Sequence, residues 1–264
     1  MGFDLRAARI LKPHPGGKRV SPLRRQSRLL VAAVSLAIAT SWALPLRALA
    51  QSSCSDPEVA NRHDGIYTNY SPVYSARGSI FDMLLPLCSP SDGTSSPSAW
   101  VMVAGGGAHE YVQIGFARQP GMASPMRFTE TSDGDGNVDL DFYPGFWSNG
   151  TNHFYEVLFD FSGPPRYFTL KADGQVFNHE TDWSPEGGEW TVGWKAQFFG
   201  ETWDRGDDMP GTSTNHEHFT NVKVIKTWGG GWVVPPNPFH PSTLSYYKFA
   251  WVTQPNYFDI WTER

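Results

Sequence analysis

The sequence predicts an all-β protein, a single antiparallel β-sandwich of the jelly-roll kind that follows a signal peptide. Three observations predict this class. Short runs rich in aromatic and β-branched residues recur along the chain, and Gly, Pro, Asn or Asp closes each of them. No long stretch has the period of a helix, and no segment repeats. About 214 residues follow the leader, which is enough for one domain with a substantial core.

The first 50 residues read as a signal peptide. They hold nine Lys or Arg residues and one acid, and they include the apolar run LLVAAVSLAIATSWAL. This run of about 16 residues is shorter than the ~20 that a membrane-spanning helix needs. Ala48-Leu49-Ala50 is the small-residue ending of a cleavage site. Arg24-Arg25 leaves the twin-arginine route open beside general secretion. We therefore expect a secreted, extracellular protein.

Cleavage after Ala50 changes the charge of the chain. The leader holds nine of the 21 basic residues and one of the 26 acidic residues, so 12 basic and 25 acidic residues remain, a formal charge of −13. An acidic surface of this kind argues against binding to nucleic acid. It suits a protein that works in mildly acidic surroundings. We also expect no stable membrane insertion once the signal has been removed.

The only two cysteines, Cys54 and Cys88, lie in the exported part of the chain. In an oxidising compartment a disulfide between them is the expected state. The bond would close a loop of 33 residues. On the chain-entropy estimate such a loop contributes about 3–4 kcal/mol. The bond would lie within an N-terminal segment, residues 51–98, where it would tie the start of the segment to the strand-like SIFDMLLPLC. The sandwich domain, residues 99–264, follows this segment.

The sandwich is predicted from a series of strand-like runs separated by turns. ADGQ, residues 172–175, has the composition of a tight hairpin turn. AGGGA, residues 104–108, precedes neither a helix nor a lysine, so it reads as a hairpin turn and not as a phosphate loop. The expected strands lie within residues 98–106, 110–118, 125–131, 137–144, 152–162, 166–178, 189–203, 218–228 and 245–262.

One of these strands carries an amide in an unusual place. In EYVQIGFAR the residues Val112, Ile114 and Phe116 alternate as an apolar face, so Tyr111 and Gln113 lie on the opposite face. A neutral amide beside an aromatic ring and a glycine is either an ordinary solvent-facing residue or part of a site. As part of a site, its N–H could stabilise a developing negative charge on a carbonyl oxygen.

The strand KAQFFGETWD offers a possible partner. Here Phe199, Glu201 and Trp203 share one face, so a carboxyl lies between two aromatic rings. Such surroundings remove water from the carboxyl and raise its pKa, which suits a general base that activates water. Gln113 and Glu201 are therefore the candidate catalytic pair, with Tyr111, Phe199 and Trp203 as aromatic residues that contact the substrate.

These motifs resemble those of the eqolisin-type glutamic peptidases. YVQIGF is similar to that family's Gln-containing strand, GETWD to its Glu motif beside a Trp, and AWVMVAGGG to its Trp-containing strand ahead of the Gln. FYEVLF is similar to an intervening aromatic–Glu strand, so Glu156 is expected to hold the substrate or pair with the site. The resemblance implies a secreted β-sandwich peptidase. One departure is that the family's Glu motif continues in a longer apolar stretch, whereas here the charged residues Asp204 and Arg205 come directly after Trp203. The sequence is also similar to uncharacterised secreted bacterial proteins with a Q-x-G strand, a kinship that implies no activity.

Two segments raise the question of a metal. His216 and His218 lie two residues apart, as on one face of a strand, but FTNVKV after them supplies no further acidic ligand. SDGDGNVDLD places oxygen ligands at alternate positions, yet Val138 stands where an EF-hand needs its glycine. We expect no cofactor, with Ca²⁺ at this loop as the alternative. Its candidate ligands are Asp133, Asp135, Asn137 and Asp139.

The sequence thus leaves two functions open. One is an acid-acting, peptidase-like hydrolase in which Glu201 activates water and Gln113 stabilises the oxyanion. The other is a non-catalytic module that binds a carbohydrate or a surface through its many aromatic side chains. Both have a polypeptide or polysaccharide as partner. The sequence reveals neither the substrate nor the oligomeric state.

Overall fold

The computed structural model describes residues 62–68, 72–85, 87, 97–105, 110–133, 137–145, 150–160, 162, 167–181, 195–202, 208–241 and 247–263. Every regular element in these ranges is a β-strand. Accordingly, the described residues contain no helix of a length and hydropathy that would span a membrane. The leader, Cys54 and Cys88 lie outside the described residues, so the expected signal peptide and disulfide remain predictions.

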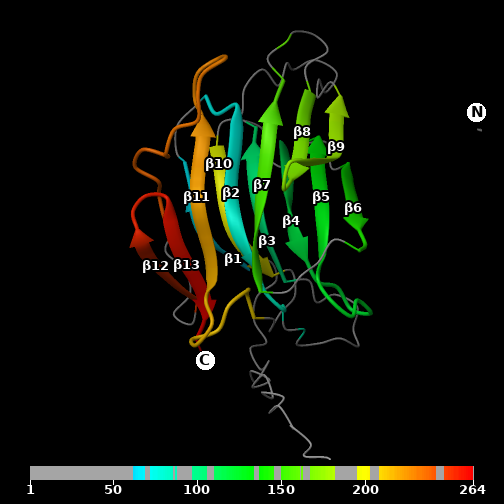
Figure 1. Ribbon diagram of the computed structural model, residues 1–264, viewed down its shortest axis with the longest axis vertical. Helices are drawn as coiled ribbons and strands as arrows, with labels where there is room; N and C mark the ends of the chain where they lie inside the picture. The colour runs from blue at the N-terminus through cyan, green and yellow to red at the C-terminus, as the bar shows by residue number, and fades with distance from the viewer. Residues whose placement is uncertain are drawn as a thin grey trace, which may run out of the picture. The chain divides into compact units, whose positions relative to one another are not determined.

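The strands form two antiparallel sheets that pack face to face, which confirms the predicted β-sandwich (Figure 1). The six-stranded sheet has the order β1-β10-β3-β4-β5-β6, and the seven-stranded sheet has the order β12-β13-β11-β2-β7-β8-β9. In Figure 1 β11, β2 and β7 lie in front of β10, β3 and β4. The first sheet comprises β1 (Arg62–Tyr67), β10 (Lys195–Thr202), β3 (Ser98–Ala104), β4 (Glu110–Ala117), β5 (Met126–Asp133) and β6 (Val138–Tyr143).

The seven-stranded sheet draws strands from both ends of the chain. Its central strand β2, together with β1 of the other sheet, comes from the part of the chain that the sequence assigned to an N-terminal segment. The sandwich therefore begins earlier than residue 99. The members of this sheet are β12 (Tyr247–Thr253), β13 (Tyr257–Thr262), β11 (Glu217–Ile225), β2 (Ser75–Asp82), β7 (Thr151–Phe159), β8 (Tyr167–Ala172) and β9 (Gln175–Thr181).

The core lies between the two sheets and follows from alternation along the strands. On β4 the residues Val112, Ile114 and Phe116 are fully buried and belong to the core, as the alternation predicted. On β10 Ala196 and Phe198 are likewise fully buried in the core. The opposite sheet contributes further buried side chains, which are Ala76, Ile80, Tyr155, Val157, Phe159, Phe168, Leu170, Ala172, Phe219, Val222, Val224, Phe258 and Ile260.

The hairpin between β8 and β9 confirms the predicted tight turn. Asp173 and Gly174 have positive φ values of 51° and 78°, as a two-residue type I′ turn requires. The Asp173 side chain accepts a hydrogen bond from the backbone N–H of Phe154 at 2.9 Å. The turn is thereby fixed to the neighbouring strand β7.

Candidate functional site

The face of the six-stranded sheet that points away from the core carries a second group of aromatic side chains. Trp100, Met102, Phe128 and Phe199 form a small buried cluster there, and Tyr67, Tyr111 and Phe142 pack against it. We call this surface the aromatic face. Alternation along β4 and β10 places Gln113 and Glu201 on it as well.

Gln113 lies in the middle of the aromatic face. It pairs with Met102 of β3 on one side and with Glu130 of β5 on the other. Its side-chain nitrogen Nε2 donates a hydrogen bond to Glu130 Oε2 at 2.9 Å. Its side-chain oxygen Oε1 is buried and has no hydrogen-bond partner in the structure. An amide oxygen in this state is available to a ligand or a water molecule.

Glu130 holds Gln113 in place and was not a candidate from the sequence. Its other carboxyl oxygen, Oε1, accepts a short hydrogen bond from the hydroxyl of Tyr111. Burial, the hydrogen bond to Glu130 and the charge of Glu130 raise the pKa of Tyr111 above its ordinary value, and the charge of Glu201 adds to this. Tyr111 therefore stays protonated and donates, and the Glu201 carboxyl lies within electrostatic range of its hydroxyl.

Glu201 is held by an aromatic side chain. The indole Nε1 of Trp100 donates a hydrogen bond to Glu201 Oε2 at 2.8 Å. Only 7% of Glu201 is exposed to solvent. A buried hydrogen bond of this kind fixes the direction of the carboxyl.

The register shows how far apart the two predicted catalytic residues are. Gln113 pairs with Met102 of β3, whereas Glu201 pairs with Ser98 of the same strand, four residues away. With β3 lying between their strands, ordinary sheet spacings put the two backbone positions roughly 16 Å apart. Side chains that lean toward each other shorten this gap. The residue of β10 that is level with Gln113 is Gln197, an amide.

The glycine of YVQIGF is explained by a close backbone approach. A Cβ atom on Gly115 would lie 2.0 Å from the backbone oxygen of Ala99 and 2.7 Å from Cα of Trp100. Gly115 is directly opposite Trp100 in the sheet. Any larger residue would push β3 and β4 apart and move the indole that holds Glu201.

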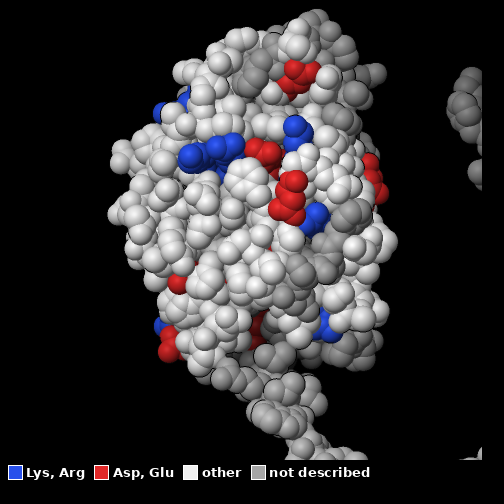
Figure 2. Space-filling model, viewed as in Figure 1, with Lys and Arg blue, Asp and Glu red and all other residues white. Residues whose placement is uncertain are grey.

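The remaining predicted substrate-binding residues have different outcomes. Tyr111 and Phe199 lie on the aromatic face, as alternation predicted. Trp203 lies outside the described residues. Glu156 is not near Gln113, because Tyr155 and Val157 of the same strand point into the core and Glu156 faces outward from the other sheet. There it forms an ion pair with Arg77 at 3.5 Å. Figure 2 views this outer face, on which basic and acidic side chains lie next to each other.

Two of the candidate metal ligands, His216 and His218, contact an acidic residue in the structure. In the ranges that the structure describes, no group of three or more His, Cys, Asp or Glu side chains is placed to hold a metal ion. His216 and His218 instead contact Asp259 through their Nδ1 atoms, at 3.2 and 2.7 Å. Asn137 and Asp139 are exposed, Asp135 lies outside the described residues, and the side chain of Asp133 is not described.

Sequence reasoning missed Glu130 and the role of Trp100. In MRFTETSD, alternation places Phe128, Glu130 and Ser132 on one face of β5, which is the signal that could have identified Glu130. Its pairing with Gln113 depends on the order of the strands in the sheet, which the sequence alone did not provide. The Trp100–Glu201 hydrogen bond joins residues 101 positions apart in the chain.

Comparisons with known proteins support the fold. A solved structure of scytalido-glutamic peptidase with a transition state analog inhibitor is similar with a TM-score of 0.50 and 14% identity, over 77% of this chain and 98% of that chain. At this identity the likeness concerns the fold alone. It confirms the resemblance to glutamic peptidases at that level.

Weaker structural similarities add nothing to this assignment. SCP-B, a member of the eqolisin family in complex with a tripeptide, has a TM-score of 0.47 and 11% identity over 77% of this chain and 98% of that chain. A family 16 endo-glucanase from Bacteroides ovatus has a TM-score of 0.32 and 13% identity over 54% and 67% of the two chains. No family model matches the sequence, and no curated protein matches it.

Proposed function

We propose that the protein is an acid-acting, peptidase-like hydrolase that binds an extended polypeptide on its aromatic face. The observation that carries the proposal is the state of Gln113. Only 2% of this residue is exposed, its nitrogen is anchored by Glu130, and its oxygen has no partner. A buried amide that is rigidly held but half unsatisfied is suited to binding a polar group of a substrate.

In this proposal the two ends of the amide have different tasks. One N–H of Gln113 donates to Glu130, so the second N–H is left to bind a carbonyl oxygen as negative charge develops on it. The oxygen Oε1 accepts a hydrogen bond from an N–H of the substrate or from water. Glu130 and Tyr111 are positioning residues, because they fix the amide.

Glu201 is the proposed general base. Trp100 donates to its Oε2 and so orients the carboxyl, which is placed to take a proton from water. Because β3 lies between the strands of Gln113 and Glu201 and their positions along it differ by four residues, the two side chains do not share one water directly. Instead, the scissile bond lies between them, above Trp100 and Met102, with the water on the Glu201 side.

The test is hydrolysis of an unfolded protein at acid pH by the mature chain. We expect Glu201→Gln and Gln113→Ala each to lower the rate at least ~100-fold, in line with the loss of a general base or of an oxyanion donor. Glu130→Gln should lower the rate less than Glu201→Gln does, because Glu130 only positions Gln113 whereas Glu201 is the proposed base. Glu156→Gln is the matched control, since Glu156 lies on the other sheet and pairs with Arg77. No hydrolysis by the parent would refute the proposal.

A second function is favoured by one specific observation. The residue level with Gln113 across β3 is Gln197, so two amides flank Met102 where a paired acid would complete a catalytic site. Amides beside the rings of Tyr67 and Tyr111 are suited to binding a polymer without cleaving it. Binding of a peptide or polysaccharide with no products, equally strong in Glu201→Gln, would support this alternative.

We also propose that the protein is exported and cleaved after Ala50. The support is the basic leader, its short apolar run and the Ala48-Leu49-Ala50 ending. The mass of the protein recovered from culture medium should correspond to a chain that starts at Gln51. The same spectrum before and after reduction tests the Cys54–Cys88 bond, which should add two hydrogens when reduced. Retention of the full chain in the cell would contradict the export.

A further inference from the structure

Two carboxyl groups are buried in the core at neighbouring positions. Asp82 ends β2 and Glu217 begins β11, and both have no solvent-exposed surface. The two strands pair with Phe219 opposite Ile80. Two residues further along this register, Glu217 comes opposite Asp82. Since Ile80 and Phe219 point into the core, so do Asp82 and Glu217.

Glu217 has little to stabilise a negative charge. Neither of its carboxyl oxygens has a hydrogen-bond partner at ordinary geometry, although the backbone amides of Phe81 and His218 face the group. Asp82 and Asp259 also lie within electrostatic range, and their charges oppose the ionisation of Glu217. An ionised carboxyl in such a place is costly, so the neutral form is favoured.

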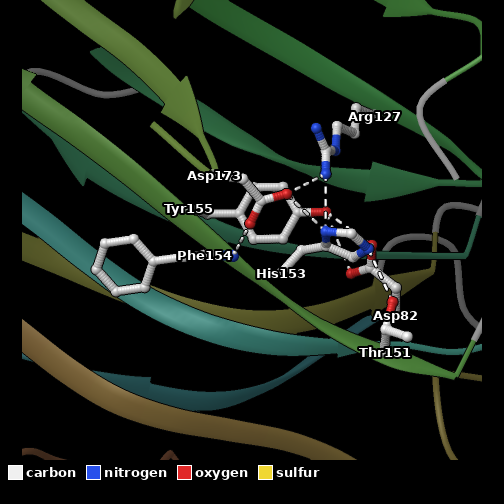
Figure 3. A network of polar contacts seen from close by, with 7 residues as sticks. All are labelled: Asp82, Arg127, Thr151, His153, Phe154, Tyr155 and Asp173. Atoms are coloured by element: carbon white, nitrogen blue, oxygen red, sulfur yellow. Dashed lines mark hydrogen bonds and ion pairs between the residues drawn. The ribbon is translucent and has the colours of Figure 1, made fainter. Parts of the chain in front are cut away.

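Asp82 is bound more fully, as Figure 3 shows. The hydroxyl of Tyr155 lies 3.1 Å from both carboxyl oxygens of Asp82, and His153 Nε2 lies 3.5 Å from one of them. Arg127 comes from β5 of the six-stranded sheet. Beside Asp82, its guanidinium contacts His153 and Asp173. The guanidinium favours an ionised Asp82, whereas the charge of Asp173 opposes it.

The balance at this site favours protons on the carboxyls. Burial raises the pKa of Asp82 well above its ordinary value, against the hydrogen bond from Tyr155 and the charge of Arg127. Burial likewise raises the pKa of Glu217, with the charges of Asp82 and Asp259 adding to the effect. Two buried carboxyls within electrostatic range of each other do not both ionise readily.

The two residues lie on a seam of the seven-stranded sheet. In the order β12-β13-β11-β2-β7-β8-β9, the pairing of β11 with β2 joins the C-terminal strands to the rest of the sheet. A bulge between Thr220 and Lys223 interrupts this pairing further along β11. Asp82 and Glu217 lie at the end of the β11–β2 pairing. Repulsion between their side chains therefore weakens this pairing directly.

We propose that Asp82 and Glu217 form a proton-dependent latch, closed when both carboxyls are protonated at acid pH and loosened at the β11–β2 seam when they ionise. Below the ordinary values of about 3.8 and 4.5 the folded and unfolded chains are both protonated, and the latch costs nothing. Above them the unfolded chain releases its protons first. Stability therefore falls as pH rises, by up to about tenfold in the folding equilibrium constant per pH unit for each group.

This latch does not depend on the proposed hydrolase activity, and a stability measurement tests it. Denaturant unfolding of the parent between pH 4 and 7 should show a folding constant that decreases steadily with pH, by more than about tenfold overall. Glu217→Gln replaces the carboxyl by a neutral group of the same shape, so it should flatten this dependence and raise stability at the higher pH. Asp82→Asn should do the same, to a smaller degree because Arg127 and Tyr155 favour its charge.

Two further variants separate the latch from its neighbours. Glu156→Gln removes an acid from the outer face of the same sheet and should leave the pH dependence as in the parent. His153→Gln removes the imidazole beside Asp82 and should preserve most of it. Hydrogen exchange should show faster exchange in β11 and β13 at pH 7 than at pH 4 after correction for the intrinsic rate. An unchanged pH dependence in Glu217→Gln, or its loss in His153→Gln alone, would overturn the proposal.

Discussion

Replacing Gly115 by alanine should be among the most destabilising small changes in the chain. The new Cβ would lie 2.0 Å from the Ala99 oxygen, whereas side-chain carbons essentially never approach closer than 3.0 Å, so the strands must separate by about 1 Å or more. A shift of this size breaks two or so ladder hydrogen bonds, each worth about 1 kcal/mol, and adds about 1–3 kcal/mol of overpacking. We expect a loss of about 3–5 kcal/mol.

Urea unfolding followed by tryptophan fluorescence measures this loss, with Gly231→Ala as the control. Gly231 has no heavy atom within 4 Å of its would-be Cβ and no positive φ, so its change should stay within about 0.5 kcal/mol. Because Trp100 lies opposite Gly115, the variant should also shift the emission spectrum. A loss below about 1 kcal/mol for Gly115→Ala would refute the reasoning, because strands packed this closely could not absorb a methyl group so cheaply.

Three other expectations follow from single contacts. Trp100→Phe removes the hydrogen bond to buried Glu201 and should cost about 1–3 kcal/mol in urea unfolding, with a smaller loss in a Glu201→Leu background. Leu170→Ala empties a fully buried site and should cost about 2–5 kcal/mol, whereas Val252→Ala, with the residue 49% exposed, should change the free energy of unfolding by less than about 0.5 kcal/mol. The raised pKa of Tyr111 means that Tyr111→Phe should leave the phenolate absorbance of the folded protein near pH 10 unchanged, and a lost phenolate signal would contradict this.

The fold was predictable because its signal is local. Alternation placed Val112, Ile114 and Phe116 in the core, and Asp173-Gly174 specified a turn whose backbone angles only such residues adopt readily. The early strands were harder. RHDGIY in β1 has charged residues and a glycine and resembles a loop, yet it is paired with β10 along its whole length.

The site was predictable only as far as alternation reaches. That pattern placed Gln113, Tyr111 and Phe199 on one face of the sheet. It could not order the strands, so it missed that Glu130 would be the carboxyl in contact with Gln113 and that Glu156 would belong to the other sheet. Strand order depends on long-range pairing, and no short motif encodes the four-residue offset between Gln113 and Glu201.

Cleavage of an unfolded polypeptide at acid pH, measured for the parent and for Glu201→Gln in parallel, tests the proposed chemistry most directly. Mass spectrometry of the products identifies new chain ends, and a binding measurement with the same peptide shows whether the aromatic face still takes up its ligand. We predict cleavage by the parent, and unchanged binding with a rate at least ~100-fold lower in Glu201→Gln. Equal cleavage by both proteins would contradict the role of Glu201. No cleavage by either would contradict the proposed hydrolase activity, and binding without cleavage would then support the binding module.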